Sequence, residues 1–237
     1  MDNIVAGVDG CKVGWIVVKW DMGKHEFTLH VAPDFFSVRS FTASVQIIAM
    51  DIPIGLLDQA VEGGRACDRL ARKMLGKRAS SVFSPPVRAT LACSTYSEAL
   101  KVNRDSSVHA LGISKQCFGI LPKIREVDCI MSPDIQRSVI EVHPELCFRT
   151  MNNDQPLLHA KKTREGLEER KALLTQHGFG TFITQALASR IDGAAPDDLL
   201  DACAACWTAQ RKASGLASQI PSSPSLDSKG LRMEMWY

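Results

Sequence analysis

Continuous apolar runs at the start of the chain predict buried strands. Residues 4–8 form such a run, which ends at Asp9 and is followed by a short turn rich in glycine at 10–14 and a second apolar run at 15–18. A continuous run, rather than an alternating one, is typical of a strand covered on both faces. Because the connecting turn is short, we expect the two runs to pair as a hairpin.

Four later segments complete the predicted set of strands. Residues 26–32 alternate between apolar and polar side chains, which indicates a third strand. The apolar residues that lead up to Asp51 predict a fourth strand, and residues 138–145 predict a fifth that also runs into acidic side chains. The alternating residues 231–237 predict a short terminal strand.

Helical periodicity dominates the remaining segments. Residues 53–135 are predicted to form a mostly helical insertion, with one helix expected to begin after Ser114 as its N-cap. Residues 161–177 carry charges in i,i+4 pairs and are interpreted as a solvated surface helix without chemistry. A last long helix is expected from Pro196, with Asp197 in its first turn.

The composition is that of a globular protein with a normal core. Of 237 residues, 45% are hydrophobic and 23% are charged, no apolar run reaches the length of a membrane span, and the first residues do not resemble a secretion signal. The eight cysteines are scattered among apolar neighbours, so we expect them to be reduced and mostly buried in a cytoplasmic protein. The net charge of +2 does not by itself indicate nucleic-acid binding.

Acidic side chains recur at the ends of the predicted elements. The candidate catalytic residues come from four separate elements and are Asp9, Asp51, Glu141, His143, Asp198 and Asp201. Two like charges at about 4 Å with an effective dielectric near 20 repel by about 4 kcal/mol, so a chain keeps such a group most readily when cations neutralise it. Carboxylate oxygens are the ligands that Mg²⁺ and Mn²⁺ prefer. We therefore expect Mg²⁺ or Mn²⁺ to be bound by Asp9, Asp51, Asp198 and Asp201. Ordinary turn-forming and capping roles are the alternative for each aspartate taken singly.

A basic segment lies inside the predicted insertion. Residues 65–88 contain seven Lys or Arg and one Asp, a local excess of six positive charges in a nearly neutral chain. A solvated helix face is the ordinary explanation, but the asymmetry also favours a flank that binds anions such as backbone phosphates. The start of the helix after Ser114 is a second possible phosphate site. The candidate substrate-binding residues are Lys12, Arg65, Arg69, Ser81, Arg88, Lys115 and Gln116.

Eight short motifs, spread over nearly the whole chain, occur together in this sequence. They are residues 7–15, 51–55, 65–68, 80–83, 113–116, 141–145, 198–202 and 233–237. Together they resemble the DUF429 family of predicted nucleases, which belongs to the ribonuclease H-like superfamily. This resemblance implies an α/β, ribonuclease H-like fold with a five-stranded mixed sheet in the order 3-2-1-4-5, strand 2 antiparallel and helices on both faces. It also implies one such domain over residues 1–237, with the helical insertion 53–135 after strand 4.

The resemblance also gives the acidic residues expected roles. Asp9, Asp51 and the Asp198/Asp201 pair are similar to the acidic positions of Holliday-junction resolvases of that superfamily, including a D-x-x-D-A motif on the last helix. This sequence departs from that pattern in having Asp51 rather than Glu on the fourth strand, and the shorter side chain changes the reach to a metal. It also departs in its long insertion.

The leading hypothesis is a Mg²⁺-dependent nuclease that hydrolyses phosphodiester bonds of nucleic acid. One alternative is an actin-like ATP-dependent phosphotransferase or ATPase, a class of protein that has the same sheet. Asp9-Gly10 fits the first phosphate loop of this class, but residues 51–55 do not match its second, glycine-rich phosphate loop. Another alternative is a nucleic-acid-binding module without catalysis. The sequence leaves open whether the substrate is DNA, RNA, a branched junction or a small nucleotide. It predicts no membrane partner and leaves the oligomeric state open, a homodimer included.

Overall fold

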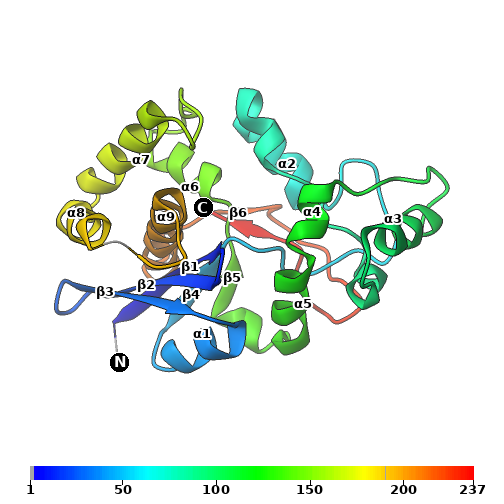
Figure 1. The fold of residues 1–237 in the computed structure, drawn as a ribbon, viewed down its shortest axis with the longest axis horizontal. Helices are drawn as coiled ribbons and strands as arrows, with labels where there is room; N and C mark the ends of the chain where they lie inside the picture. The colour runs from blue at the N-terminus through cyan, green and yellow to red at the C-terminus, as the bar shows by residue number, and fades with distance from the viewer. Residues whose placement is uncertain (1–2, 190) are drawn as a thin grey trace. The chain divides into compact units, whose positions relative to one another are not determined.

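A computed structural model describes residues 3–189 and 191–237, which form a mixed α/β protein (Figure 1). The main sheet has five strands in the order β3-β2-β1-β4-β5. The strands are β1 (Ile4–Cys11), β2 (Gly14–Asp21), β3 (Glu26–Ala32), β4 (Ile47–Met50) and β5 (Val139–Glu141). β2 is antiparallel to both of its neighbours, whereas β1, β4 and β5 are parallel. The predicted mixed sheet and its strand order are confirmed.

The register of the parallel strands determines which acidic residues become neighbours. Val8 of β1 lies level with Met50 of β4, and Met50 lies level with Glu141 of β5. One residue further along, Asp51 N donates to Val8 O at 3.0 Å. Asp9 and Asp51 therefore lie level with each other on the neighbouring strands β1 and β4. Because side chains alternate between the two faces of a sheet, Asp9 and Asp51 project from one face and Glu141 from the other.

Helices cover both faces of this sheet. α1 (Phe35–Phe41) packs against β2 and β3, and α9 (Pro196–Ala213) packs against β1, β2 and β4 on the opposite face (Figure 1). Three more helices pack against α9, which are α6 (Pro144–Met151), α7 (Arg164–Gln176) and α8 (Gly180–Ala188). α9 is therefore a central helix, buried between the sheet and the other helices.

The contact between β1 and α9 is unusually close because the residues that meet are small. A Cβ atom at Gly7 would lie only 2.0 Å from Ala202 O and 2.1 Å from Cys206 N. The buried middle of α9 is built from alanines and cysteines over residues 202–206, each 0% exposed. Only glycine on the strand lets the helix backbone come this near.

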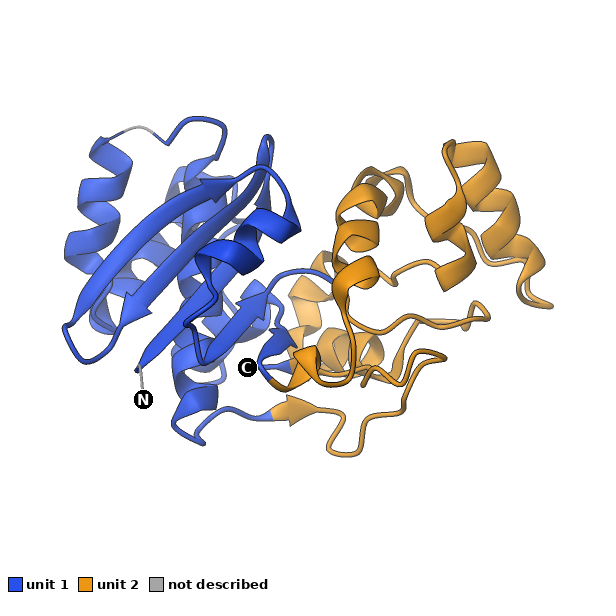
Figure 2. Ribbon diagram, turned by 90° about the horizontal axis from the view of Figure 1, so that it is seen from below, with its two compact units in different colours: residues 1–52, 138–218, 236–237 blue, residues 53–137, 219–235 orange. Residues whose placement is uncertain are grey.

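The chain divides into two compact units, coloured separately in Figure 2. The first contains the main sheet and comprises residues 1–52, 138–218 and 236–237. The second comprises residues 53–137 and 219–235, so it contains the predicted insertion 53–135 and also a C-terminal segment. Its helices are α2 (Ala66–Leu75), α3 (Tyr96–Asp105), α4 (Lys115–Gly119) and α5 (Leu121–Ile130), with short 3₁₀ helices at Gly76–Ser81, Arg88–Ala92 and Ile135–Arg137.

The second unit is held together by buried polar contacts as well as by an apolar cluster. The guanidinium of Arg65, 1% exposed, donates to the carboxylate of Asp68 at 2.8 Å and to two backbone carbonyls of the preceding loop at 3.1 Å. Asn103 accepts from Val87 N at 3.0 Å and donates to Leu111 O at 2.8 Å. The C-terminal segment adds β6 (Gln219–Ile220), which pairs with β7 (Met235–Trp236) in a two-stranded sheet.

Some element boundaries differ from those expected. The helix after Ser114 is divided into α4 and α5, because Pro122 in the first turn of α5 has no N–H with which to continue the earlier helix. The predicted surface helix 161–177 begins only at Arg164, and the terminal strand is limited to β7. All eight cysteines are free, and seven of them are buried. Among the described residues, no helix combines the length and apolar character that crossing a membrane requires.

Candidate acidic site

Three carboxylates from β1, the end of β4 and α9 form the electrostatic centre of the first unit. Asp9 is 7% exposed, and Asp201 is 2% exposed. Burial raises the pKa of Asp9 well above its usual value, and the charges of Asp51 and then Asp201 raise it further. Such mutual effects require the three carboxylates to lie close together. The structure therefore brings together Asp9, Asp51 and Asp201, as the sequence predicted.

Asp201 is the most deeply buried member of this group. Burial raises its pKa to about 7, although the charge of Lys161 opposes the shift. Its Oδ2 accepts a hydrogen bond from Lys161 Nζ at 2.8 Å, whereas its Oδ1, within the part of the chain that the structure describes, is buried without a hydrogen-bond partner. A buried carboxylate oxygen without a partner is costly, so this atom marks a place where a cation would be stabilising.

Asp197 and Asp198, the two aspartates in the first turn of α9, have different roles. Asp198 Oδ2 accepts from Ala195 N at 2.8 Å, so it is Asp198, rather than Asp197, that completes the helix cap. Asp198 is nevertheless close enough to raise the pKa of Asp9, although its effect is the smallest of those that shift Asp9. Asp197 lies one turn before Asp201 and shares Lys161 with it, at 3.9 Å from Nζ to Oδ2. Asp197 therefore belongs to the acidic group, although the sequence interpretation gave it only a dipole role.

Lys161 is the residue that sequence reasoning missed. It was assigned to a solvated helix, but it lies in the turn before α7 and its ammonium reaches Asp201 across 40 positions of sequence. Burial lowers the pKa of Lys161, but the charge of Asp201 and their hydrogen bond outweigh that effect and hold the pKa above its ordinary value. No periodicity in the sequence pointed to this contact, because it depends on the tertiary path between α6 and α7.

A buried ion pair lies behind this turn. Arg170 of α7 is 0% exposed, and its guanidinium donates to the carboxylate of Glu145 on α6. Burial raises the pKa of Asp51 and the charge of Glu145 adds to this shift, whereas the charge of Arg170 lowers the pKa of Asp201. His143, the N-cap residue of α6, lowers the pKa of Asp51. His143 is thus near the acidic group, together with Glu145 and Arg170, which were not predicted.

Glu141 is not brought to this group. It is the last residue of β5, level with Met50, and the alternation of side chains directs it to the sheet face opposite Asp9 and Asp51. β5 ends at Glu141, but Val142 N still donates to Met50 O at 2.9 Å, and His143 keeps an extended backbone as the N-cap residue of α6.

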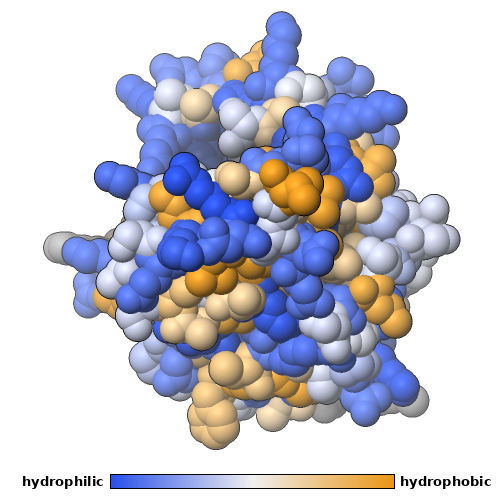
Figure 3. Space-filling view, turned by 90° about the vertical axis from the view of Figure 1, so that its right-hand side faces the viewer, coloured by the Kyte–Doolittle hydropathy of each residue, from blue (hydrophilic) through white to orange (hydrophobic). Residues whose placement is uncertain are grey.

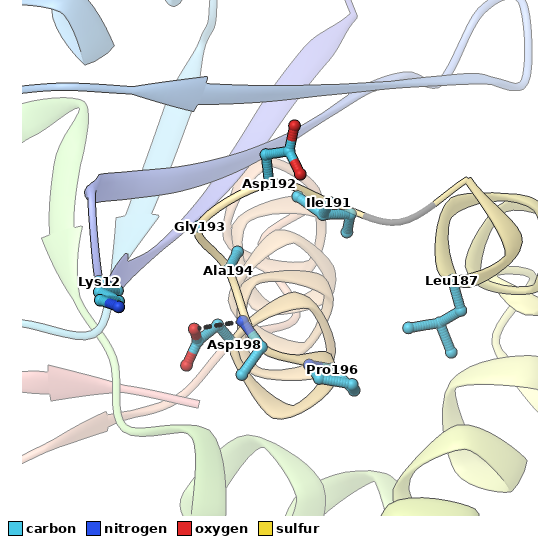
Figure 4. A pocket seen from close by; sticks show the side chains of 9 residues that line it. Lys12, Leu187, Ile191, Asp192, Gly193, Ala194, Pro196 and Asp198 are labelled. Atoms are coloured by element: carbon cyan, nitrogen blue, oxygen red, sulfur yellow. Dashed lines mark hydrogen bonds between the residues drawn. The ribbon is translucent and has the colours of Figure 1, made fainter.

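A pocket of about 530 Å³ adjoins the start of α9 (Figure 4). Lys12, from the β1–β2 turn, and Asp198 lie at its polar side, and its apolar side includes Leu187 and Ile191. Asp198 belongs both to this pocket and to the acidic group, because its charge acts on Asp9. Asp9, Asp51 and Asp201 are not among the described residues that line the pocket, so Asp198 is its link to the acidic group.

The remaining predicted substrate-binding residues belong to the second unit, and several are already engaged there. Arg65 is buried in its pair with Asp68, and Arg88 pairs with both Asp128 and Asp227. Arg69 is exposed and donates to Gly64 O, and Ser81 Oγ donates to Arg78 O at 2.8 Å. Lys115 and Gln116 are exposed at the start of α4, with Ser114 as the predicted N-cap. The face seen in Figure 3 is mainly hydrophilic, with scattered apolar groups, as is normal for a solvated surface.

The acidic group is not arranged as a ready-made metal centre. Within residues 3–189 and 191–237, no set of three or more His, Cys, Asp or Glu side chains stands in positions that could hold a metal ion together. Lys161 lies at Asp201 and Asp197 instead, and its ammonium supplies positive charge among the carboxylates.

The fold and the site together define an α/β protein with an acidic group at the carboxyl ends of β1 and β4, beside the first turns of a central helix. The sequence matches the family described as "Protein of unknown function (DUF429)" over residues 7–225, and the chain belongs to this family. No curated protein and no solved structure matches the chain. The resemblance to the DUF429 family is thereby confirmed, whereas the ribonuclease H-like superfamily and nuclease activity stay predictions.

Proposed function

We propose that this protein is a divalent-metal-dependent nuclease that hydrolyses phosphodiester bonds of nucleic acid. The observation that carries the proposal is the convergence of Asp9, Asp51 and Asp201 from three separate elements, with one buried oxygen of Asp201 that has no partner among the described residues. Acidic groups placed outside the carboxyl ends of sheet strands are where α/β proteins commonly build sites.

The chemistry of these side chains suits Mg²⁺ or Mn²⁺. Hard carboxylate oxygens are the ligands that these ions prefer, and Asp201 Oδ1 has no hydrogen-bond partner within the part of the chain that the structure describes. In this proposal Asp9, Asp51 and Asp201 hold the cation, and Asp198 contributes the oxygen that its cap does not use. When bound, a divalent ion activates a water molecule and stabilises the leaving oxygen of a phosphodiester.

The other residues would orient the substrate and the acidic group. Lys12 is exposed and lines the pocket, where its ammonium would pair with a backbone phosphate. The apolar side of the pocket offers a surface for a sugar or a base. His143 acts on the charge of Asp51, which gives it a positioning role rather than a metal-binding one.

The test is a cleavage assay with the full-length protein. Labelled single-stranded DNA, duplex DNA, RNA and a four-way junction are incubated with Mg²⁺, Mn²⁺ or EDTA. We expect cleavage of at least one substrate with metal and none with EDTA. Asp9→Asn and Asp201→Asn should each remove at least 100-fold of the activity, whereas Asp134→Asn, an 86% exposed side chain on the second unit, should leave it unchanged.

Two outcomes would refute the proposal. One is activity that persists in the Asp9→Asn/Asp201→Asn double variant. The other is the lack of metal-dependent cleavage on every substrate. Calorimetry with ATP and Mg²⁺ addresses the actin-like alternative, because tight ATP binding without nucleic-acid cleavage would favour a phosphotransferase or ATPase.

A further inference from the structure

The second unit contains a small pocket of its own. The pocket has a volume of about 120 Å³, and its lining residues lie within 57–64, within 84–87, at 103 and within 111–113. Most of the lining is apolar, with Leu57, Pro85 and Ile113 among its side chains. A cavity of about 150 Å³ admits one benzene ring, so this pocket has the size for a single planar ring.

Two polar side chains tie the walls of this pocket together. Arg72 of α2 donates to Gly63 O at 2.7 Å and to Ser84 Oγ at 2.6 Å, so one guanidinium joins the first two lining segments. Asn103, which is 3% exposed, joins the second of these segments to the last one through two hydrogen bonds to the backbone. Because these ties all lie within one unit, the pocket is preformed for a ligand.

Arg69 of α2 provides a cation beside this pocket. A Cβ atom at the lining residue Gly63 would lie 3.0 Å from Arg69 Cγ, so the stem of Arg69 runs along this wall. The guanidinium donates to the carbonyl of Gly64, which also lines the pocket, and most of its five N–H donors remain for an anion. Arg69 is exposed, and residues 65–88 carry the local excess of six positive charges. This rim therefore favours a negatively charged ligand.

The pocket also offers a hydrogen-bond donor within its apolar lining. Ser84 Oγ accepts from Arg72, and a hydroxyl group has one hydrogen of its own to donate. A ligand that uses all three features has a flat ring, a carbonyl on that ring and an attached anion. A pyrimidine nucleotide has these groups, whereas a purine has a second fused ring. An apolar side chain of a protein partner would fill the pocket but would make no use of Arg69.

We propose that this pocket binds the pyrimidine base of an unpaired nucleotide, whose phosphate lies on the guanidinium of Arg69. A base inside a duplex is stacked and paired, so only a single strand or a locally unpaired segment presents its base to such a pocket. The inference rests on the proposed function for the presence of nucleic acid. It adds the class of substrate, which is unpaired and contains pyrimidines.

The experiment measures binding by fluorescence anisotropy with the full-length protein in EDTA, so that it does not depend on cleavage. The probes are labelled oligo-dT, oligo-dA and a mixed-sequence DNA duplex of equal length. We expect oligo-dT to bind about 10-fold more tightly than oligo-dA or the duplex. Equal binding of oligo-dT and oligo-dA, or a duplex that binds as tightly as oligo-dT, would overturn the inference. These comparisons use the wild-type chain and do not depend on any variant.

Two variants then test the pocket and its rim separately. Val61 lines the pocket and is 48% exposed, so Val61→Trp should fill the pocket and remove the preference for oligo-dT. Arg69→Gln should reduce the slope of log binding constant against log salt concentration by about 0.7, which is one phosphate contact on a single strand. A folded Val61→Trp protein that keeps the preference would overturn the inference, as would an Arg69→Gln protein with an unchanged slope.

Lys73→Gln is the matched control for Arg69→Gln. Lys73 is exposed one turn further along α2, and it is not among the described residues that line the pocket. The substitution removes the same charge and should leave the salt slope and the preference for oligo-dT unchanged. A slope that falls equally in Lys73→Gln and Arg69→Gln would show general attraction to the basic segment and would overturn the assigned role of Arg69.

The inference and the proposed function fail in different ways. A chain that binds oligo-dT as described, yet cleaves nothing with Mg²⁺ or Mn²⁺, keeps the inference and refutes the nuclease proposal. A chain that cleaves nucleic acid but binds purine strands or duplexes as tightly as oligo-dT keeps the nuclease proposal and refutes the inference. A chain that binds no oligonucleotide refutes the inference and leaves the pocket to an apolar side chain of a protein partner.

Discussion

The substitution Gly7→Ala tests how the acidic group is assembled. Gly7 lies in β1 two residues before Asp9, at the point where α9 crosses the strand. An added Cβ would lie 2.0 Å from Ala202 O and 2.1 Å from Cys206 N, and both of these atoms belong to the backbone of α9. Neither can rotate away as the end of a side chain could, so the helix as a whole has to move.

The size of the effect follows from this geometry. An ordinary contact of a Cβ atom begins near 3.4 Å, so α9 would have to retreat by about 1.4 Å along this direction. Overpacking a well-packed core costs about 1–3 kcal/mol and occasionally more. Because α9 is packed between the sheet and three other helices, we expect Gly7→Ala to lower the free energy of unfolding by about 3 kcal/mol or more.

Urea unfolding followed by circular dichroism, in EDTA at pH 7, measures this free energy. The control is Gly119→Ala at the last residue of α4, where an added Cβ meets nothing within 4 Å. We expect the control to be as stable as the wild type or slightly more stable. A Gly7→Ala protein within 1 kcal/mol of the wild type would refute the argument that β1 and α9 meet at backbone contact.

Three further predictions follow from the described contacts. The folded-state pKa of Asp201 (about 7) lies above its unfolded value of 3.8, so the stability that its proton contributes is present at low pH and is lost as the pH rises towards 7. The free energy of unfolding of the wild type in EDTA, measured relative to Asp201→Asn, should therefore fall by about 2 kcal/mol between pH 5 and 7. A difference that does not change with pH would contradict burial of Asp201 as the cause. Arg170→Met leaves the Glu145 carboxylate buried without its partner and should cost about 3–5 kcal/mol in urea unfolding, whereas an unchanged midpoint would show that the pair is not desolvated. Lys12→Ala should remove about one phosphate contact, which reduces the slope of log binding constant against log salt concentration by about 0.9. Arg65→Ala should instead destabilise the second unit, because Arg65 is buried in its pair with Asp68. A Lys12→Ala protein that is destabilised, or an Arg65→Ala protein that stays folded and loses one phosphate contact, would contradict these roles.

The elements of the first unit could be predicted well from the sequence because their signals are local. The hairpin of β1 and β2 follows from two apolar runs and a glycine-rich turn, and β3 has the predicted bounds of 26–32. The position of Asp9 and Asp51 at neighbouring strand ends also follows, because both aspartates come directly after apolar runs that end at the same edge of the sheet. In these cases the physical cause lies within a few residues of the side chain concerned.

The features that could not be predicted depend on register or on contacts remote in sequence. The face on which Glu141 projects is determined by the level of β5 against β4, and a shift by one residue would reverse it. Lys161 was assigned to a surface helix because i,i+4 charge pairs are frequent on such helices, although the helix begins three residues later. The hydrogen bond from Lys161 to Asp201 spans 40 positions, and no repeat in the sequence indicates it.

The energetics of the acidic group bear on why the chain retains it. Burial raises the pKa values of Asp9, Asp51 and Asp201, and the charge of Asp51 adds to the shifts of Asp9 and Asp201, so these carboxylates oppose folding when they are ionised without a cation. A neutral residue at position 201 would avoid the burial of a charge that raises the pKa of Asp201 and would leave no carboxylate oxygen without a partner among the described residues. Structural stability alone therefore does not account for an aspartate at this position. A cation that binds the folded state and not the unfolded chain would make the ionised aspartates stabilising, because its attraction to them would outweigh the cost of their burial. The cost of Asp201 in the metal-free protein is thus itself an argument for the cation-binding role.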